Sequence, residues 1–292
     1  AFWQDYLAPV QAPTRLVDAV GTSEKGEFRR HPITFDAATS DRLRQAARDQ
    51  GLTINTLVQA AWARVLGRFT GQQRVVFGNT VAGRPADLAG SDAMLGLFIN
   101  TLPMTVSLAG DQPLASWLAA LQADNAALRE HGHAPLFDVQ QDAGWGGESL
   151  FDTLLVFENY PLDESLLGSG QQTLTLGTPR SHEFTHYPLT VAVLPGDQLD
   201  MLFAHDTAAL PIPLVDRLAR QFRDTLLMLA EQGGEETALL ATLDALGGDE
   251  AILQQWGEGE GAYAPQSFPA LFSQQAALRG EAIALVHGDT RV

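Results

Sequence analysis

Apolar residues recur along the chain with two different periods, which together predict a mixed α/β fold. Between Thr53 and Gly71 they recur every three to four residues, as on one face of a helix, with Thr53 as candidate N-cap and Gly71 just past the end. Near-continuous apolar runs instead predict buried strands, at 75–77, 95–106 and 149–159. Because helices and strands do not alternate strictly, we expect a mixed sheet flanked by helices.

The second half of the chain contains the clearest antiparallel pair. Residues 187–206 form two apolar runs around a Pro-Gly-Asp-Gln turn, which predicts a hairpin. A long amphipathic helix is expected between Pro211 and Gly233. Gly and Pro make residues 131–148 look irregular, and 162–185 read as a long polar excursion, which inside a compact domain is usually functional.

The stretch Arg74–Val106 has the least usual residue choices. An apolar run is expected to end at Gly78 and Asn79, and a Gly/Pro/Asp-rich loop follows before the apolar series resumes. That second series contains Asn100 and Thr101 inside a buried-looking strand. A buried Asn without a hydrogen bond costs about 1–3 kcal/mol, so either neighbouring backbone or a wet cleft must satisfy it.

Composition excludes several classes of function. The 292 residues carry a formal charge of −17, with 35 acidic against 18 basic residues and no basic cluster, which argues against binding nucleic acid or anionic membranes. The absence of cysteine excludes disulfides, thiolate metal sites and a cysteine nucleophile. No apolar run approaches the ~20 residues that span a bilayer, and no export signal is visible, so we expect a cytoplasmic protein.

Residue spacing alone identifies no catalytic group. His182 and His186 have a metal-like i, i+4 spacing, but on a strand such positions lie about 13 Å apart, so no metal site is predicted. The segment GNTVAGRP lacks the Lys-Ser/Thr pair of a phosphate-binding loop and the third glycine of a dinucleotide fingerprint, and GxSxG is absent. The residues therefore predict a fold class and a cleft, but no nucleophile or general base.

Six motifs in order resemble one known family. They are FWxxYLAP, VVFGNTVAGRP, LGLFINTLPMTV, HAPLFDVQ, SLFDTLLVFENYP and THYPLTVAV, followed by the amphipathic helix. This order resembles the second half of a condensation domain of nonribosomal peptide synthetases over about residues 1–232. The segment from Ser267 resembles the opening of an adenylation domain. The resemblance thus divides the chain into a condensation-domain C-terminal lobe (1–232), a linker (233–265) and the start of an adenylation domain (266–292).

The resemblance implies a lobe like chloramphenicol acetyltransferase and an amide-forming acyltransferase. Two carrier proteins would present aminoacyl or peptidyl thioesters on phosphopantetheine arms in a tunnel between two lobes, with no cofactor bound directly. The family's catalytic HHxxxDG motif is absent from the sequence. We expect it in a preceding N-terminal lobe, since the chain begins in an apparent helix and stops in an apparent strand. The chain alone, without catalytic residues, would be inactive.

The resemblance also nominates site residues. Asn100 and Thr101 match a family motif and are candidates for the tunnel lining, as are Asn159 and Tyr160 at a strand end, and then His186; strand packing remains the alternative for Asn100 and Thr101. We expect Arg84 to fix its loop by a hydrogen bond or ion pair.

The segments 83–91 and 162–185 are candidates for reaching the other lobe. Expected partners are the missing lobe, upstream and downstream carrier proteins and the adenylation domain. Two alternatives stay open, which are a non-catalytic carrier-docking or scaffold unit and an epimerising or cyclising relative.

Overall fold

A mixed sheet is the centre of the larger of the two units, Ala1–Gly247 and Gly248–Val292, into which the chain divides. The computed structural model describes residues 2–20, 26–82, 90, 94–147, 149–158, 185–235, 238–240 and 267–292. Within these residues the sheet has six strands in the order β1-β6-β5-β4-β2-β3. The strands are β1 (Phe28–Thr34), β2 (Arg74–Val81), β3 (Asn100–Ser107), β4 (Thr153–Phe157), β5 (Leu189–Pro195) and β6 (Leu199–Asp206).

The sheet combines parallel and antiparallel pairs, as predicted. β4 runs parallel to both β2 and β5, whereas β1–β6, β5–β6 and β2–β3 are antiparallel. In the β2–β3 pair Val81 lies opposite Asn100, so β3 begins beside the carboxyl end of β2. The carboxyl ends of β2, β4 and β5 and the start of β3 therefore share one end of the sheet.

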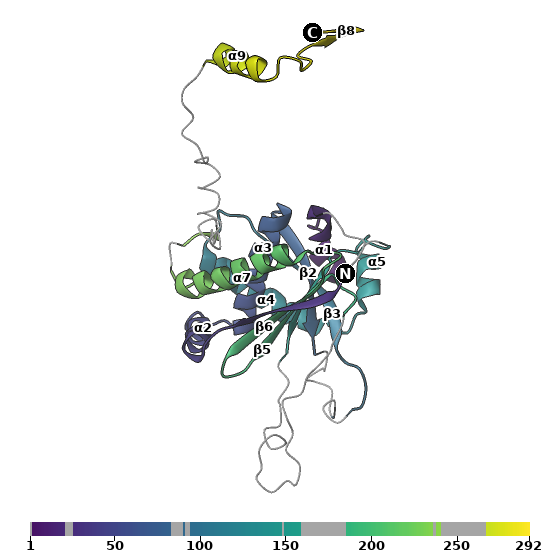
Figure 1. Ribbon diagram of the computed structural model, residues 1–292. Coiled ribbons are helices and arrows are strands. Elements are labelled where there is room, and N and C mark those ends of the chain that lie inside the picture. Colours follow the sequence, from purple (N-terminus) through teal and green to yellow (C-terminus); the bar gives the residue numbers. More distant parts are fainter. Residues whose placement is uncertain are drawn as a thin grey trace, which may run out of the picture. The chain divides into compact units, whose positions relative to one another are not determined.

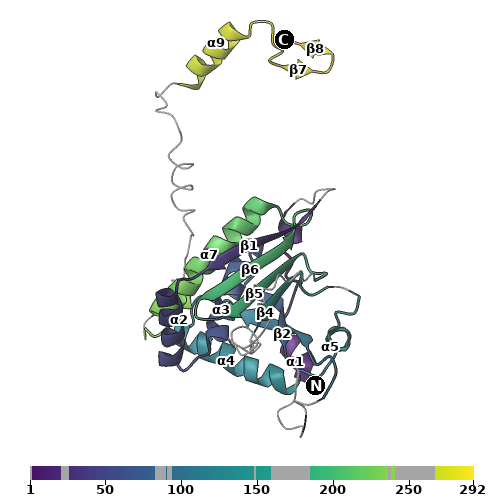
Figure 2. The same cartoon turned by 60° about the horizontal axis from the view of Figure 1, so that its bottom comes forward.

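Helices cover one face of this sheet. Figures 1 and 2 show α3 and α7 side by side across it, with α2 and α4 at their flanks. Trp62 of α3, Phe203 of β6 and Phe222 of α7 meet edge to face, with ring centroids 5.7–6.1 Å apart. The helices are α1 (Phe2–Leu7), α2 (Ala37–Asp49), α3 (Ile54–Thr70), α4 (Leu114–Glu130), α5 (Leu136–Asp142) and α7 (Ile212–Gln232), with a 3₁₀ turn η1 (Val17–Ala19).

Local signals for helix ends are confirmed. The Thr53 hydroxyl accepts a hydrogen bond from the Thr56 N–H at 3.2 Å and so caps α3. Gly71 ends the same helix with a φ of 70°, a conformation that glycine adopts without strain. The predicted 187–206 hairpin is present as β5 and β6, and the long helix is present as α7.

Three sequence expectations are wrong. Residues 131–148 contain α5, which follows Pro135 and buries Val139. β3 begins at Asn100 and not at 95, and Leu95 is fully exposed, so the apolar series does not mark a strand there. β2 continues through Gly78 and Asn79, where a side chain at Gly78 would come within 3.0 Å of Phe151.

The smaller unit contains α9 (Phe268–Leu278) and a hairpin of β7 (Val286–His287) and β8 (Thr290–Arg291). The predicted helix is present, and the predicted strand is a two-stranded hairpin. All of its described residues, 267–292, are exposed, so these elements enclose no core of their own.

Candidate functional site

A cavity of about 470 Å³ opens where β2, β4 and β5 end. Its lining comes from four places in the fold, which are the start of α3, the last turns of α4, the end of β2 and the ends of β4 and β5. Arg129 is the one charged residue among those that the structure places around it. The lining residues are Thr53, Ile54, Asn55, Asn79, Thr80, Val81, Ala82, Asn125, Leu128, Arg129, Phe157 and Pro195.

Three buried amide side chains support this cavity. Gln59 of α3 donates from Nε2 to Asn79 Oδ1 of β2 at 3.1 Å, and Asn125 of α4 donates from Nδ2 to Gln59 Oε1. Asn125 also reaches the Leu121 carbonyl at 3.1 Å. The chain of amides joins two helices to the strand, and buried polar groups need such partners. The network fixes the side chains of Asn79 and Asn125 at the cavity wall.

The first turn of α3 adds polar atoms to the opening. The Thr56 hydroxyl donates to Gln122 Oε1 of α4, whose Nε2 donates to the Gly51 carbonyl at 3.3 Å. The Oδ1 atom of Asn55 is buried and has no hydrogen-bond partner among the described residues. Amides and hydroxyls on a largely neutral wall suit the binding of a neutral polar chain, and they offer no nucleophile.

Asn100 is satisfied by backbone. Its Nδ2 donates to the carbonyls of Gly132 and Ala134, both at 2.8 Å, and its Oδ1 accepts from the Thr101 N–H at 2.9 Å. Asn100 therefore ties the start of β3 to the turn between α4 and α5. Thr101, opposite Thr80 of β2, is half-buried.

β3 is an outer strand of the described sheet, and side chains close its free edge. The Thr105 N–H donates to the Tyr6 hydroxyl at 3.1 Å, and this hydroxyl lies 3.4 Å from the Thr105 carbonyl. Trp117 donates from Nε1 to the Ser107 carbonyl at 2.8 Å. Pro103, between them and the start of the strand, has no N–H. An edge covered in this way offers little for another strand to pair with.

His186 lies at the other end of the sheet from Asn100, because it comes just before β5 begins at Leu189. Its ring is 4.2 Å from that of Tyr187, which in turn stacks on Phe151 at 5.6 Å. Burial raises the pKa of Tyr187. The described residues thus do not bring His186 together with Asn100 and Thr101.

The remaining candidates lie outside the described residues. They are Arg84, Asn159, Tyr160 and nearly all of the segments 83–91 and 162–185. Their assignments stay predictions.

The scattered titratable groups have structural partners. Asp152 Oδ2 accepts the Val17 N–H at 2.9 Å, and burial raises the pKa of this carboxyl. His205 Nδ1 lies 2.9 Å from the Leu210 carbonyl, and burial lowers the pKa of its ring. Among the described residues no group of three or more His, Asp or Glu side chains is arranged to hold a metal ion, and no helix is long and apolar enough to cross a membrane.

The amide network is the part of this site that sequence reasoning misses. The local pattern predicts that Asn79 breaks a strand, and Gln59 stands among apolar positions of α3 without a recognisable motif. The one available signal is a glutamine on a helix whose residues 56–63 are all buried.

Comparison with known proteins agrees with the motifs. The chain matches the sequence profile of the condensation domain over residues 1–247. Part of the linear gramicidin synthase of Brevibacillus parabrevis is 33% identical over 298 residues, which are 98% of this chain and 6% of that protein. Chondramide synthase cmdD of Chondromyces crocatus is 37% identical over 306 residues, 98% of this chain and 8% of that protein. The chain therefore spans a small part of these relatives.

The fold agrees as well. The first condensation domain of the calcium-dependent antibiotic synthetase superposes with a TM-score of 0.60 at 17% identity, covering 83% of this chain and 52% of that one. The α/β lobe of the chloramphenicol acetyltransferase type, with a mixed sheet flanked by helices, is thereby confirmed. From the profile match, the two relatives and the fold together, this chain belongs to the condensation domain family of nonribosomal peptide synthetases.

Proposed function

We propose that residues 1–232 are the C-terminal lobe of a condensation domain that forms an amide bond between carrier-bound thioesters. The observation that carries this proposal is the match to the condensation domain over 1–247 together with relatives that are peptide synthases by name. The amine of one carrier-bound aminoacyl group would attack the thioester carbonyl of the other. The amide bond forms as the C–S bond breaks, and the donor phosphopantetheine leaves as a thiol.

This lobe would contribute binding surface and not the catalytic base. The neutral wall of amides at the ends of β2 and β4 suits an extended phosphopantetheine or peptidyl chain, which is polar and carries amide groups. Asn100, Thr101, Asn159 and Tyr160 remain our candidates for the tunnel lining, with His186 after them. The HHxxxDG histidine would come from an N-terminal lobe, so this chain alone would be inactive.

We further propose that 233–265 connect this lobe to an adenylation domain that begins at 266–292. Ala238 and Leu240 are buried, and Leu240 N–H donates to the Gln112 carbonyl at 3.1 Å, so this part of the segment belongs to the larger unit. Carrier proteins upstream and downstream would deliver both substrates.

The test restores the missing lobe. The 292-residue chain is mixed with a separately produced N-terminal lobe that contains HHxxxDG, taken from a relative, and with two carriers loaded with aminoacyl thioesters. Intact-protein mass spectrometry then measures dipeptidyl carrier. We expect product only when both lobes are present and none when the second histidine of the motif is replaced by alanine.

Size-exclusion chromatography of the two lobes is run in parallel, because the result depends on their assembly. Lobes that co-elute and yet form no dipeptide with any carrier pair would contradict the amide-forming role. Carrier binding by this chain alone, without restored activity, would instead support the docking or scaffold alternative. Inversion of an aminoacyl carrier would support an epimerising relative.

A further inference from the structure

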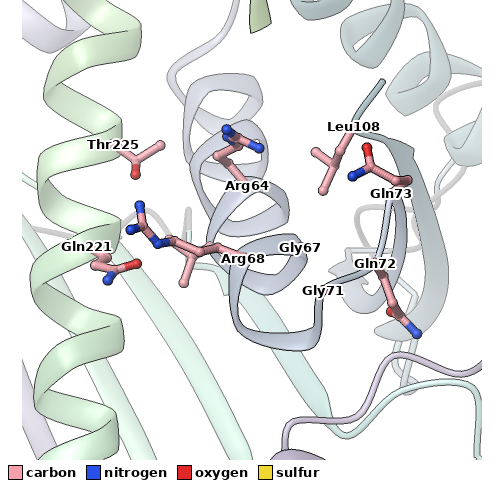
Figure 3. A pocket seen from close by; sticks show the side chains of 10 residues that line it. Arg64, Gly67, Arg68, Gly71, Gln72, Gln73, Leu108, Gln221 and Thr225 are labelled. Carbon is pink, nitrogen blue, oxygen red and sulfur yellow. The ribbon is translucent and has the colours of Figure 1, made fainter. Parts of the chain in front are cut away.

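A second cavity, of about 220 Å³, lies at the other end of the sheet from the amide-lined one. It is bounded by the last turns of α3, the middle of α7 and the turn into β2 (Figure 3). Neither the site motifs nor the proposed reaction uses it. Its lining residues are Arg64, Val65, Gly67, Arg68, Gly71, Gln72, Gln73, Leu108, Gln221 and Thr225.

The charge of this cavity is opposite to that of the protein. The chain as a whole carries −17, yet none of the ten described lining residues is acidic and two are arginines. Arg64 and Arg68 are also the only charged residues of α3. A helix that has all of its charge on one cavity wall, in a strongly acidic protein, sets up a local positive potential.

The two arginines are placed to act on one ligand. They are four residues apart on α3 and so lie on the same face, one turn from each other. In Figure 3 the side chain of Arg68 extends toward Gln221 and Thr225 of α7, while Gln73 and Leu108 form the opposite wall. Arginine, amide and hydroxyl groups around one space are donors that suit the oxygens of a phosphate.

The backbone keeps this space open. A Cβ atom on Gly67 would lie 2.0 Å from Leu108 Cδ1, so α3 and Leu108 approach closely there only because residue 67 has no side chain. Gly71 has a φ of 70° and no atom within 4 Å of its Cβ direction. Both glycines border the cavity.

The end of α3 works against an anion, but less strongly than the arginines favour it. The last turn of a helix carries a partial charge of about −0.5, whereas two guanidinium groups contribute about +2. The balance is positive. It also matches a phosphate monoester, which carries about −1.5 to −2 charges at pH 7, better than it matches a singly charged carboxylate.

From this cavity we infer a binding site for a phosphate group, with Arg64 and Arg68 as its charged ligands and the donors of α7 completing it. The phosphate could be free or part of a monoester, and the two sources share the same chemistry. The inference does not depend on the proposed reaction.

The test measures binding of inorganic phosphate to the 292-residue chain by isothermal titration calorimetry at pH 8 and constant ionic strength. We expect saturable binding that Arg64→Gln and Arg68→Gln each weaken about tenfold, since a hydrogen bond to a charged group contributes about that factor. Arg42→Gln, which removes the same charge from an exposed position of α2, should leave binding unchanged. Circular dichroism checks that every variant is folded.

Two further titrations identify the ligand. Methyl phosphate should bind at least as tightly as inorganic phosphate if the site takes monoesters, and more weakly if it takes the free ion. Acetate should bind at least about tenfold more weakly than either, because it carries a single charge. No saturable phosphate binding, equal loss in the Arg42→Gln variant, or acetate binding as tight as phosphate would each overturn the inference.

Discussion

At the scale of single residues, polar groups in this protein act by satisfying backbone. Asn100, in the most family-specific motif, binds two carbonyls of the turn before α5 and the N–H of its own neighbour. Of the two explanations open for a polar residue in an apolar strand, neighbouring backbone accounts for its hydrogen bonds. A role in the tunnel would be compatible with this one, because the same contacts hold the start of β3 at the end of the sheet where β2 ends.

Replacing Asn100 tests its structural part. In Asn100→Ala the Gly132 and Ala134 carbonyls lose their donor, so we expect the free energy of unfolding to fall by about 1–3 kcal/mol. Urea unfolding followed by circular dichroism measures the change. Gln11→Ala, at an exposed position, is the control and should change stability by less than about 0.5 kcal/mol. Equal stabilities of the two variants would refute this assignment.

The amide network predicts coupling between Gln59 and Asn79. Gln59→Leu leaves Asn79 Oδ1 buried without its donor, and Asn79→Leu leaves Gln59 Nε2 without its acceptor, so each change should cost about 1–3 kcal/mol. The double variant should cost less than the sum, because no partner is left to orphan. A double-mutant cycle from urea unfolding gives the coupling. Additive costs, as expected for Gln59→Leu combined with the remote Gln11→Ala, would count against the network.

His205 predicts a pH dependence of stability. Burial lowers the pKa of its ring below the value of about 6.5 expected in the unfolded chain. The unfolded state then binds more protons between the two pKa values, so this stabilisation is complete above about pH 6.5 and is lost as the pH falls below it. Unfolding free energies at pH 7.5 and 5.5 should differ more for the wild type than for His205→Gln. The same difference in both would show that other groups control the dependence.

At the scale of elements, how much the sequence predicts depends on how local the cause is. Thr53 and Gly71 predict both ends of α3, since a cap involves only neighbouring residues. The seven-residue α5 escapes prediction because it is too short to show a helical period among Gly and Pro. The start of β3 is placed too early because Leu95 and Leu97 are apolar and yet exposed, which composition alone cannot distinguish.

The closed edge of β3 could not have been predicted from local pattern, because Tyr6 and Thr105 are 99 positions apart in sequence. Tyr6→Phe keeps the ring and removes the hydroxyl that serves the Thr105 backbone. We expect a loss of about 1–2 kcal/mol in stability and faster hydrogen exchange at the Thr105 amide.

Tyr187→Phe is the matched control for this edge. The Tyr187 hydroxyl has no hydrogen bond to a residue that the structure describes, so its removal should leave exchange at Thr105 unchanged. Equal exchange rates at Thr105 in the two variants would mean that α1 does not protect the edge.

At the scale of the whole molecule, apolar side chains gather where the proposed tunnel would lie. Leu95 and Leu97 are 102% and 88% exposed just before β3, and Phe137 is 69% exposed on α5, whose preceding turn is bonded to Asn100. The motif GLFINTLP thus has two parts with different physical roles. Its polar and proline residues fix and close a strand, and its leading leucine faces solvent. The motif marks this region as important, but nothing in its residues shows that the apolar half is uncovered.

Exposed apolar groups of this size favour association of the 292-residue chain with itself. We expect sedimentation velocity to show a weight-average mass that rises with concentration, and Leu95→Ser with Leu97→Ser to reduce this rise. Leu278→Ser, which removes an exposed leucine from α9 in the smaller unit, tests whether any exposed apolar residue has the same effect. Because the charge of −17 opposes self-association, the rise should be steeper at 0.5 M than at 0.05 M salt. A constant monomeric mass in both salts would argue that this surface is not adhesive, and with it against a lobe that needs a second lobe to cover it.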